Sequence, residues 1–183
     1  IISFEASPIN FESLKNKEAR LKKKFSKSII LLENIALGSS IESKKLKQFD
    51  ESSSSTLSQI NENSKYFKKK FAWVNLFNKR NKLYNEIQID INTLDNYIEK
   101  NKIDLIDLVK IDTEGFEFEI LRGATRNIKK VKLILFEHHY DDMIKKNYNF
   151  SHINQLLNQN NFFKIHKVKM PFRKTFEYVY MNR

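Results

Sequence analysis

Acidic residues and histidines stand directly after two apolar stretches of the sequence. Asp112 and Glu114 follow DLIDLVKI, and Glu137 and His138 follow LILF. A carboxylate beside an imidazole can take a proton from a hydroxyl group or hold a cation. Each residue alone has a simpler explanation, because acids stabilise helix N-termini and single histidines are often structural. Together, the four predict a polar cleft.

Strands and helices alternate along the chain and would position these residues. Apolar or alternating patterns predict strands at 1–5, 28–39, 86–91, 105–111, 131–140, 162–170 and 176–182. Helical spacing and capping residues predict helices from residue 8 onward and at 93–101, 114–122 and 149–161. This order indicates an α/β domain with a mainly parallel sheet. The last two strands should be antiparallel, because only a short link joins them.

The cleft would lie where the carboxyl ends of neighbouring strands meet. Glu5 ends the first strand, and Ser7 and Pro8 follow as a helix cap and a first-turn proline. An acid at the position of Glu5 can accept both hydroxyls of a ribose, or it can serve only the helix dipole. Spacing alone does not separate these two readings.

The composition is that of one folded domain of 183 residues, 40% of them hydrophobic. The net charge of +11 could indicate nucleic acid or an anionic surface, but the lysines are spread along the chain. We interpret the short runs at 22–24 and 68–70 as solvated faces. The sequence has no cysteine, which excludes thiol chemistry and disulfides. No apolar run is long enough to span a bilayer, and no signal peptide is visible. We expect a cytoplasmic protein.

Residues 40–84 interrupt the regular order. The polar segment 40–64, which includes ESSSSTLSQINENS, predicts a surface loop or an active-site cover. The segment 66–84 mixes aromatic and basic residues without a clear period, and we interpret it as an irregular or partly helical insertion within a single domain of residues 1–183.

The stretch KIDTEGFEFEILRGA, with TLDNYIEKN before it and LILFEHH after it, closely resembles the FkbM-type S-adenosylmethionine-dependent methyltransferases. Their hallmark is K-I-D-x-E-G-x-E. FEASPINFESLKNK is similar to the family's F-E-P-x-P-x-N stretch, with Ala6 where proline is usual. ENIALGS resembles N-x-A-x-S, and SSSSTL resembles a serine pair before a leucine. The similarity keeps the same order from residue 1 to about 140, which is more specific than any single motif.

The resemblance implies a Rossmann-like class I methyltransferase fold. It also implies methyl transfer from S-adenosylmethionine to an oxygen of a sugar or another secondary metabolite. The acceptor would be a small molecule or a glycan, with no nucleic-acid partner. Five residues would contact the cofactor, with Glu5 at the ribose and the last three around the adenine: Glu5, Ala6, Asn34, Ile35 and Ala36.

The same resemblance implies roles at the transfer cleft. Asp112 and Glu114 would line it, and His138, oriented by Glu137, is the first candidate for the base, with Asp112 as a competitor. Gly115 would keep the helix start free of a side chain so that a ligand can come close. We expect no metal, because nothing defines a ligand geometry for the group that could cluster on paper, Asp112, Glu137, His138 and His139.

The glycine loop with which the family's domain opens, D-x-G-A-N-x-G, has no counterpart among the three glycines, Gly38, Gly115 and Gly123. In the family's sheet order, 3-2-1-4-5-7-6, the absent first strand would lie between the strands 1–5 and 105–111. We therefore expect residues upstream of Ile1, and we expect these 183 residues alone neither to fold well nor to bind the cofactor tightly.

Two alternative functions compete with methyl transfer. A basic nucleic-acid-binding domain would use the lysines with Phe67, Phe71 and Trp73 as stacking platforms, and its affinity would fall steeply with salt. A catalytically inactive methyltransferase-like module would serve as a protein partner. An intact upstream glycine loop would favour the enzyme over that module.

Overall fold

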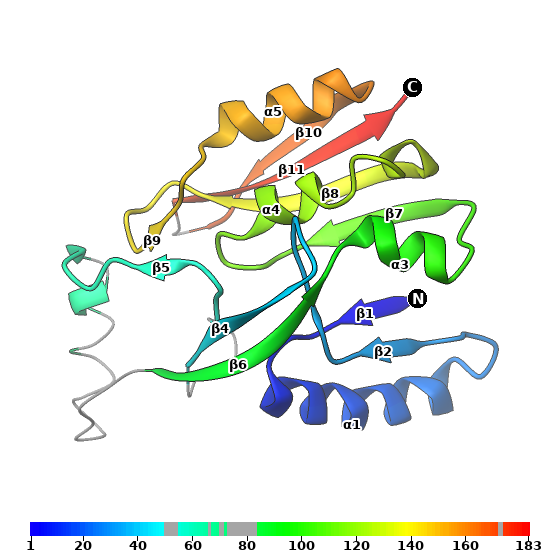
Figure 1. Cartoon of the computed structure of the whole chain (residues 1–183), viewed down its shortest axis with the longest axis horizontal. Coiled ribbons are helices and arrows are strands. Elements are labelled where there is room, and N and C mark those ends of the chain that lie inside the picture. The colour runs from blue at the N-terminus through cyan, green and yellow to red at the C-terminus, as the bar shows by residue number, and fades with distance from the viewer. Residues whose placement is uncertain (50–54, 66, 70–71, 73–83, 172–173) are drawn as a thin grey trace.

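The protein is described by a computed structural model over residues 1–49, 55–65, 67–69, 72, 84–171 and 174–183 (Figure 1). The described helices are α1 (Pro8–Lys24), α3 (Leu94–Lys100), α4 (Glu117–Arg122), α5 (Phe150–Gln159) and the short 3-10 helix η2 (Ile128–Lys130). The described strands are β1 (Ile2–Phe4), β2 (Leu31–Glu33), β3 (Ala36–Leu37), β4 (Glu42–Phe49), β5 (Gln59–Ile60), β6 (Tyr84–Asn92), β7 (Ile106–Ile111), β8 (Val131–His139), β9 (Ile144–Lys145), β10 (Phe162–Lys169) and β11 (Thr175–Asn182).

The largest sheet has the strand order β10-β11-β8-β7. β7 and β8 are parallel neighbours, with Ile106 opposite Val131 and Ile111 opposite Phe136. The pair β10 and β11 is antiparallel, as the short link between them predicted. The strands predicted at 105–111 and 131–140 therefore end side by side. This is the arrangement that the prediction of a common cleft assumed.

The remaining strands form small sheets of order β1-β2, β3-β6-β4 and β5-β9. Of the seven strand pairs among the described residues, four are antiparallel. The fold is α/β, but the expectation of one mainly parallel sheet is wrong for the described part of the chain. The pairing of β4 with β6 and that of β11 with β8 supply most of the antiparallel pairing.

Helix α5 covers one face of the four-stranded sheet (Figure 1). Its N-terminus is closed by Asn149 and His152, each side chain accepting a hydrogen bond from the other's backbone N–H. Its buried residues Ile153 and Leu157 pack in the main core, together with Phe136 of β8. Burying an apolar helical stripe in this way stabilises both layers.

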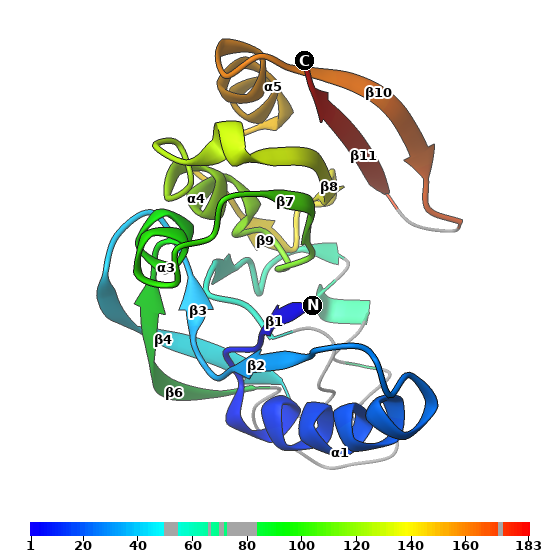
Figure 2. The same cartoon turned by 90° about the vertical axis from the view of Figure 1, so that its right-hand side faces the viewer.

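The first strand and helix agree with the sequence. Ser7 caps α1 by accepting a hydrogen bond from the N–H of Asn10 at 3.3 Å, and Pro8 lies in the first turn. In Figures 1 and 2 the β1–β2 pair lies between α1 and the four-stranded sheet. Within the described residues β1 pairs with β2 and belongs to a different sheet from β7. A strand between β1 and β7 stays a prediction.

The polar segment 40–64 contains a strand that the sequence did not predict. β4 pairs with β6 along its whole length and buries Leu46 and Phe49. The prediction of a surface loop is wrong for this strand, because its only two apolar side chains, Leu46 and Phe49, lie three residues apart among polar residues and give no alternating pattern.

Most of the predicted insertion 66–84, including Phe71 and Trp73, lies outside the described residues. Phe67 is buried in a small core with Phe49 and Ile144, so its ring is not an exposed stacking platform. In the part of the chain that the structure describes, no helix is both long enough and apolar enough to cross a bilayer.

Candidate active site

The ends of β7 and β8 bring three acidic groups and one histidine together. The Nε2 atom of His139 lies 3.4 Å from Oε2 of Glu114 and 3.6 Å from Oε2 of Glu137. The carboxyl group of Asp112 interacts with that of Glu137 both by charge and by a side-chain hydrogen bond. Three of the four predicted catalytic residues, Asp112, Glu114 and Glu137, thus lie in one cluster, and the fourth, His138, does not.

Successive residues of a strand point to opposite faces, which separates His138 from Glu137. His138 is 2% exposed and faces the side of the sheet covered by α5, with ring contacts to Tyr140, Tyr148 and Phe150. Its Nδ1 atom has no hydrogen-bond partner in the described structure. The predicted orientation of His138 by Glu137 is wrong, and His139 occupies the place beside Glu137.

The cluster shifts the proton affinities of its members. Burial, together with the charge and hydrogen bond of Asp112, raises the pKa of Glu137 to about 7 against the opposing effect of His139. Burial lowers the pKa of His139, but Asp141, Glu114 and Glu137 outweigh this effect and leave it raised. The Glu137 carboxyl group therefore changes its protonation near neutral pH, beside an imidazole whose protonated form the surrounding acids favour.

His139 is also held from its other ring nitrogen. Its Nδ1 atom lies 3.1 Å from Oγ1 of Thr175 and 3.5 Å from Oδ2 of Asp141. Burial raises the pKa of Asp141, but hydrogen bonds from His139 and Met143 outweigh it and leave that pKa lowered. The ring of His139 is thus fixed by groups on β11 and on the segment after β8.

His138 has the opposite electrostatic environment. Burial, together with the positive charges of Lys146 and His139, lowers its pKa to about 3. A group with so low a pKa is a weak proton acceptor at neutral pH.

The loop between β7 and α4 is held from inside by Glu117, which is fully buried. Its carboxylate accepts hydrogen bonds from the N–H of Gly115 at 2.9 Å, the hydroxyl of Thr113 at 3.3 Å and the hydroxyl of Tyr148 at 2.5 Å. Burial and the charge of Glu117 raise the pKa of Tyr148, so the phenol stays protonated and donates. A buried carboxylate requires such donors, and here they arrange the loop that carries Asp112 and Glu114.

Glu114 and Gly115 both have positive φ, 50° and 97°. A Cβ atom on Gly115 would lie 2.5 Å from Cγ2 of Ile144. Glycine is therefore needed for the backbone conformation and for the packing of Ile144. The expectation that it leaves room for a ligand is wrong, because a side chain of the protein fills that space.

The residues predicted to contact the cofactor gather near the ends of β1 and β2. Asn34 donates from Nδ2 to the carbonyl oxygen of Glu5 at 2.8 Å, and Ala6 packs against the small core that contains Ala36. The carboxylate of Glu5 accepts a hydrogen bond from the N–H of Ser7 at 2.8 Å. Burial raises the pKa of Glu5, and hydrogen bonds from Ser7 and Asn10 partly offset this effect. Glu5 therefore does serve the helix start, while the ribose reading remains a prediction.

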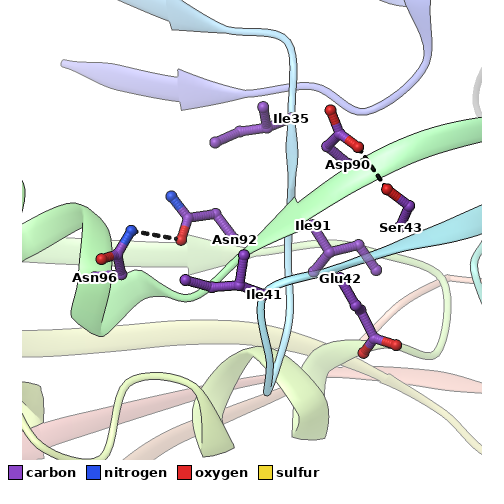
Figure 3. Close-up of a pocket in the computed structure, with 8 residues that line it drawn as sticks. All are labelled: Ile35, Ile41, Glu42, Ser43, Asp90, Ile91, Asn92 and Asn96. Carbon is purple, nitrogen blue, oxygen red and sulfur yellow. Dashed lines mark hydrogen bonds between the residues drawn. The ribbon is translucent and has the colours of Figure 1, made fainter.

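Ile35, just before β3, lines an open cavity of about 420 Å³ together with residues of β4, β6 and α3 (Figure 3). Figure 3 shows two hydrogen-bonded pairs in its wall, Asn96 with Asn92 and Ser43 with Asp90. Its other lining residues are Ile41, Glu42 and Ile91. The wall combines aliphatic faces with amide and carboxylate groups, which suits a planar ring with polar edges.

Among the described residues, no group of three or more histidine, cysteine, aspartate or glutamate side chains has an arrangement that could hold a metal ion.

The sequence interpretation assigned no role to three contributors to this site. His139 had a usable signal, because residues two apart on a strand share a face and Glu137 was already a candidate. Glu117 lay inside the recognised motif, but nothing in its spacing revealed a buried acceptor. Tyr148 is distant in sequence and reaches Glu117 only through the packing of α4 on the segment before α5.

A family model described as the methyltransferase FkbM domain matches residues 1–164. The chain is also similar to a solved structure, the crystal structure of a methyltransferase FkbM from Methylobacillus flagellatus KT, with 16% sequence identity and a TM-score of 0.60. This match covers 98% of the present chain and 36% of that one. No curated protein matches. At this identity the structural likeness shows a shared fold.

Proposed function

Because the chain belongs to the FkbM methyltransferase family, we propose that the protein transfers a methyl group from S-adenosylmethionine to a hydroxyl oxygen of a sugar or another small molecule. The observation that carries the proposal is the cluster of Asp112, Glu114, Glu137 and His139 at the adjoining ends of β7 and β8. The proposal concerns the whole protein, since the chain spans 36% of the solved relative's length.

The region after β1 and β2 suits the nucleoside half of the cofactor. Glu5 offers a carboxylate to the ribose hydroxyls, a role that a paired acceptor performs well. Ile35 offers an aliphatic surface to an adenine face, and Asn96 offers an amide to its edge. None of the three glycines lies in a loop of the form D-x-G-A-N-x-G, so we expect this chain alone to bind the cofactor weakly.

When bound, S-adenosylmethionine supplies an electrophilic methyl group. The residues of the cluster then have to accept the hydroxyl proton of the acceptor. Glu137 fits this role, because a base is most effective when its pKa lies near the working pH, and its pKa is raised to about 7. His139 beside it compensates the negative charge of the ionised carboxylate. Asp112, whose side chain is 47% exposed, lies at the accessible edge of the cluster, where an acceptor hydroxyl can reach it.

The burial of His138 among aromatic rings favours Glu137 over His138 as the base. His138 faces away from the cluster, and its pKa of about 3 leaves it with little affinity for a proton. His139, by contrast, contacts two of the acids.

Calorimetry with S-adenosylmethionine and an assay for S-adenosylhomocysteine release test the proposal. We expect the protein in its full length to bind the cofactor and to release product when a panel of sugars and secondary metabolites is supplied. We expect the 183 residues alone to bind much more weakly. Failure of the full-length protein to bind would contradict the proposed activity. Micromolar binding by the 183 residues would instead refute the prediction of an incomplete cofactor site.

A further inference from the structure

The segment 55–60, here called the strap, connects β4 with the two segments that carry the acidic cluster. These are the loop after β7 and the segment after β8. Thr56 exchanges backbone hydrogen bonds with Lys47 of β4, at 2.9 and 3.1 Å. Gln59 and Ile60 pair with β9, shortly after the segment that carries Asp141. The strap therefore contacts the segment after β8 and, through its side chains, the loop after β7.

Two hydroxyl groups of the strap bind the loop that carries Glu114. The hydroxyl of Thr56 donates to the carbonyl oxygen of Glu114 at 2.8 Å, and that of Ser58 donates to the carbonyl oxygen of Gly115 at 2.8 Å. Thr56 is 1% exposed. Both loop residues have positive φ and precede the first residue of α4, so the strap supplies partners that helix geometry does not.

The peptide group between Glu114 and Gly115 is held at both ends. Thr56 binds its oxygen, and the buried carboxylate of Glu117 accepts a hydrogen bond from its N–H at 2.9 Å. Fixing this peptide plane fixes the direction in which the Glu114 side chain leaves the backbone. That side chain ends 3.4 Å from Nε2 of His139.

We propose that Thr56 and Ser58 are positioning residues of the active site, whose hydroxyls hold the Glu114–Gly115 backbone so that the Glu114 carboxylate lies beside His139. The catalytic meaning of this inference rests on the proposed function, but the geometric claim does not. A displaced carboxylate would change the charge around His139 and the alignment of the cluster.

Variants of Thr56 in the full-length protein test the proposal. Thr56→Val keeps the shape and removes the hydroxyl, whereas Thr56→Ser keeps the hydroxyl. The matched control is Thr125→Val, since Thr125 also donates from its hydroxyl to a backbone carbonyl, that of Arg122 at 3.2 Å, but after α4 on an exposed surface. The readouts are the NMR titration of the His139 ring and the separate values of kcat and KM for methyl transfer.

Thr56→Val should lower the pKa at which His139 titrates and reduce kcat about 10- to 100-fold with little change in cofactor affinity. Thr56→Ser and Thr125→Val should behave like the unchanged protein. If Thr56→Val unfolds the protein, the NMR titration of His139 is measured instead in Ser58→Ala. This variant removes a hydroxyl that is only partly buried. A folded Thr56→Val or Ser58→Ala protein with an unchanged His139 titration would overturn the inference. A changed titration in a protein that transfers no methyl group would uphold it and reject the proposed function.

Discussion

The Nε2 atom of His139 lies 3.4 Å from Oε2 of Glu114, so the end of β8 and the loop after β7 meet in one charged cluster. Neither residue would face the other without two local features. The strand alternation of β8 turns His139 away from the aromatic core that holds His138, and Glu114 lies with a positive φ in the loop that carries its carboxylate to His139. Four predictions follow from this cluster and from the loop that supports it.

Replacing Glu137 by Gln should reduce turnover about 10²- to 10⁴-fold, because the amide cannot accept the proton of the acceptor. Initial rates of S-adenosylhomocysteine formation measure this, and calorimetry should show little change in cofactor affinity. His138→Gln is the discriminating comparison. A loss at His138 as large as that at Glu137, in a protein that remains folded, would move the base assignment to His138.

The free energy of unfolding should decrease as the pH rises through the ionisation of Glu137. Its pKa is raised to about 7 in the folded protein, against about 4.3 in an unfolded chain. The folded state therefore binds more protons between these values. The contribution of Glu137 to stability is complete below its pKa in the unfolded chain. It is lost as the pH rises through its pKa in the folded protein.

Urea unfolding at a series of pH values measures this effect. In Glu137→Gln the free energy of unfolding should depend less steeply on pH between about pH 5 and 7. Asp112, Glu114 and His139 face Glu137, as does Glu177, which lies opposite it on β11, so part of the slope will remain. Glu12→Gln, on the exposed face of α1, should leave the slope unchanged. Equal slopes in the unchanged protein and in Glu137→Gln would contradict the assignment.

Replacing Tyr148 by Phe should destabilise the fold by about 1–3 kcal/mol, because the fully buried carboxylate of Glu117 loses a donor. Tyr180→Phe is the matched control. Tyr180 donates to a neutral acceptor, Oδ1 of Asn154, at 2.6 Å, and its loss should cost only about 0.5–1.5 kcal/mol. Denaturant unfolding of the two variants measures the loss of unfolding free energy in each. Equal losses would show that the charge of Glu117 does not strengthen its hydrogen bond with Tyr148.

Gly115→Ala should destabilise the fold more than Gly38→Ala. A side chain at Gly115 meets both a positive φ of 97° and a contact of 2.5 Å with Ile144, while at Gly38 it meets the side chains of Ile91 and Phe116 without a positive φ. The left-handed backbone alone costs about 1–2 kcal/mol for a residue with a Cβ. Urea unfolding of Gly115→Ala combined with Ile144→Ala separates the two causes. The second change should relieve the contact and leave the backbone cost.

Elements with strong periodicity were predicted well. The strand 105–111 was observed as Ile106–Ile111, the helix 149–161 as Phe150–Gln159, and the last two strands are antiparallel as expected. In each of these segments local pattern and tertiary environment favour the same structure. β4 was missed because its partner strand, and not its own composition, makes it a strand.

The sequence by itself determined the kind of site. Acidic residues after two apolar strands, in the motif KIDTEGFEFEILRGA, were sufficient to predict the cluster and the family, because strand ends and motif order are local properties of the chain. The tertiary structure alone decided which histidine joins the cluster, and it showed that Glu117, Thr56 and Tyr148 hold the loop. The physical reason is that the face of a strand and the partners of a buried carboxylate depend on segments distant in sequence, which come together only when the chain folds.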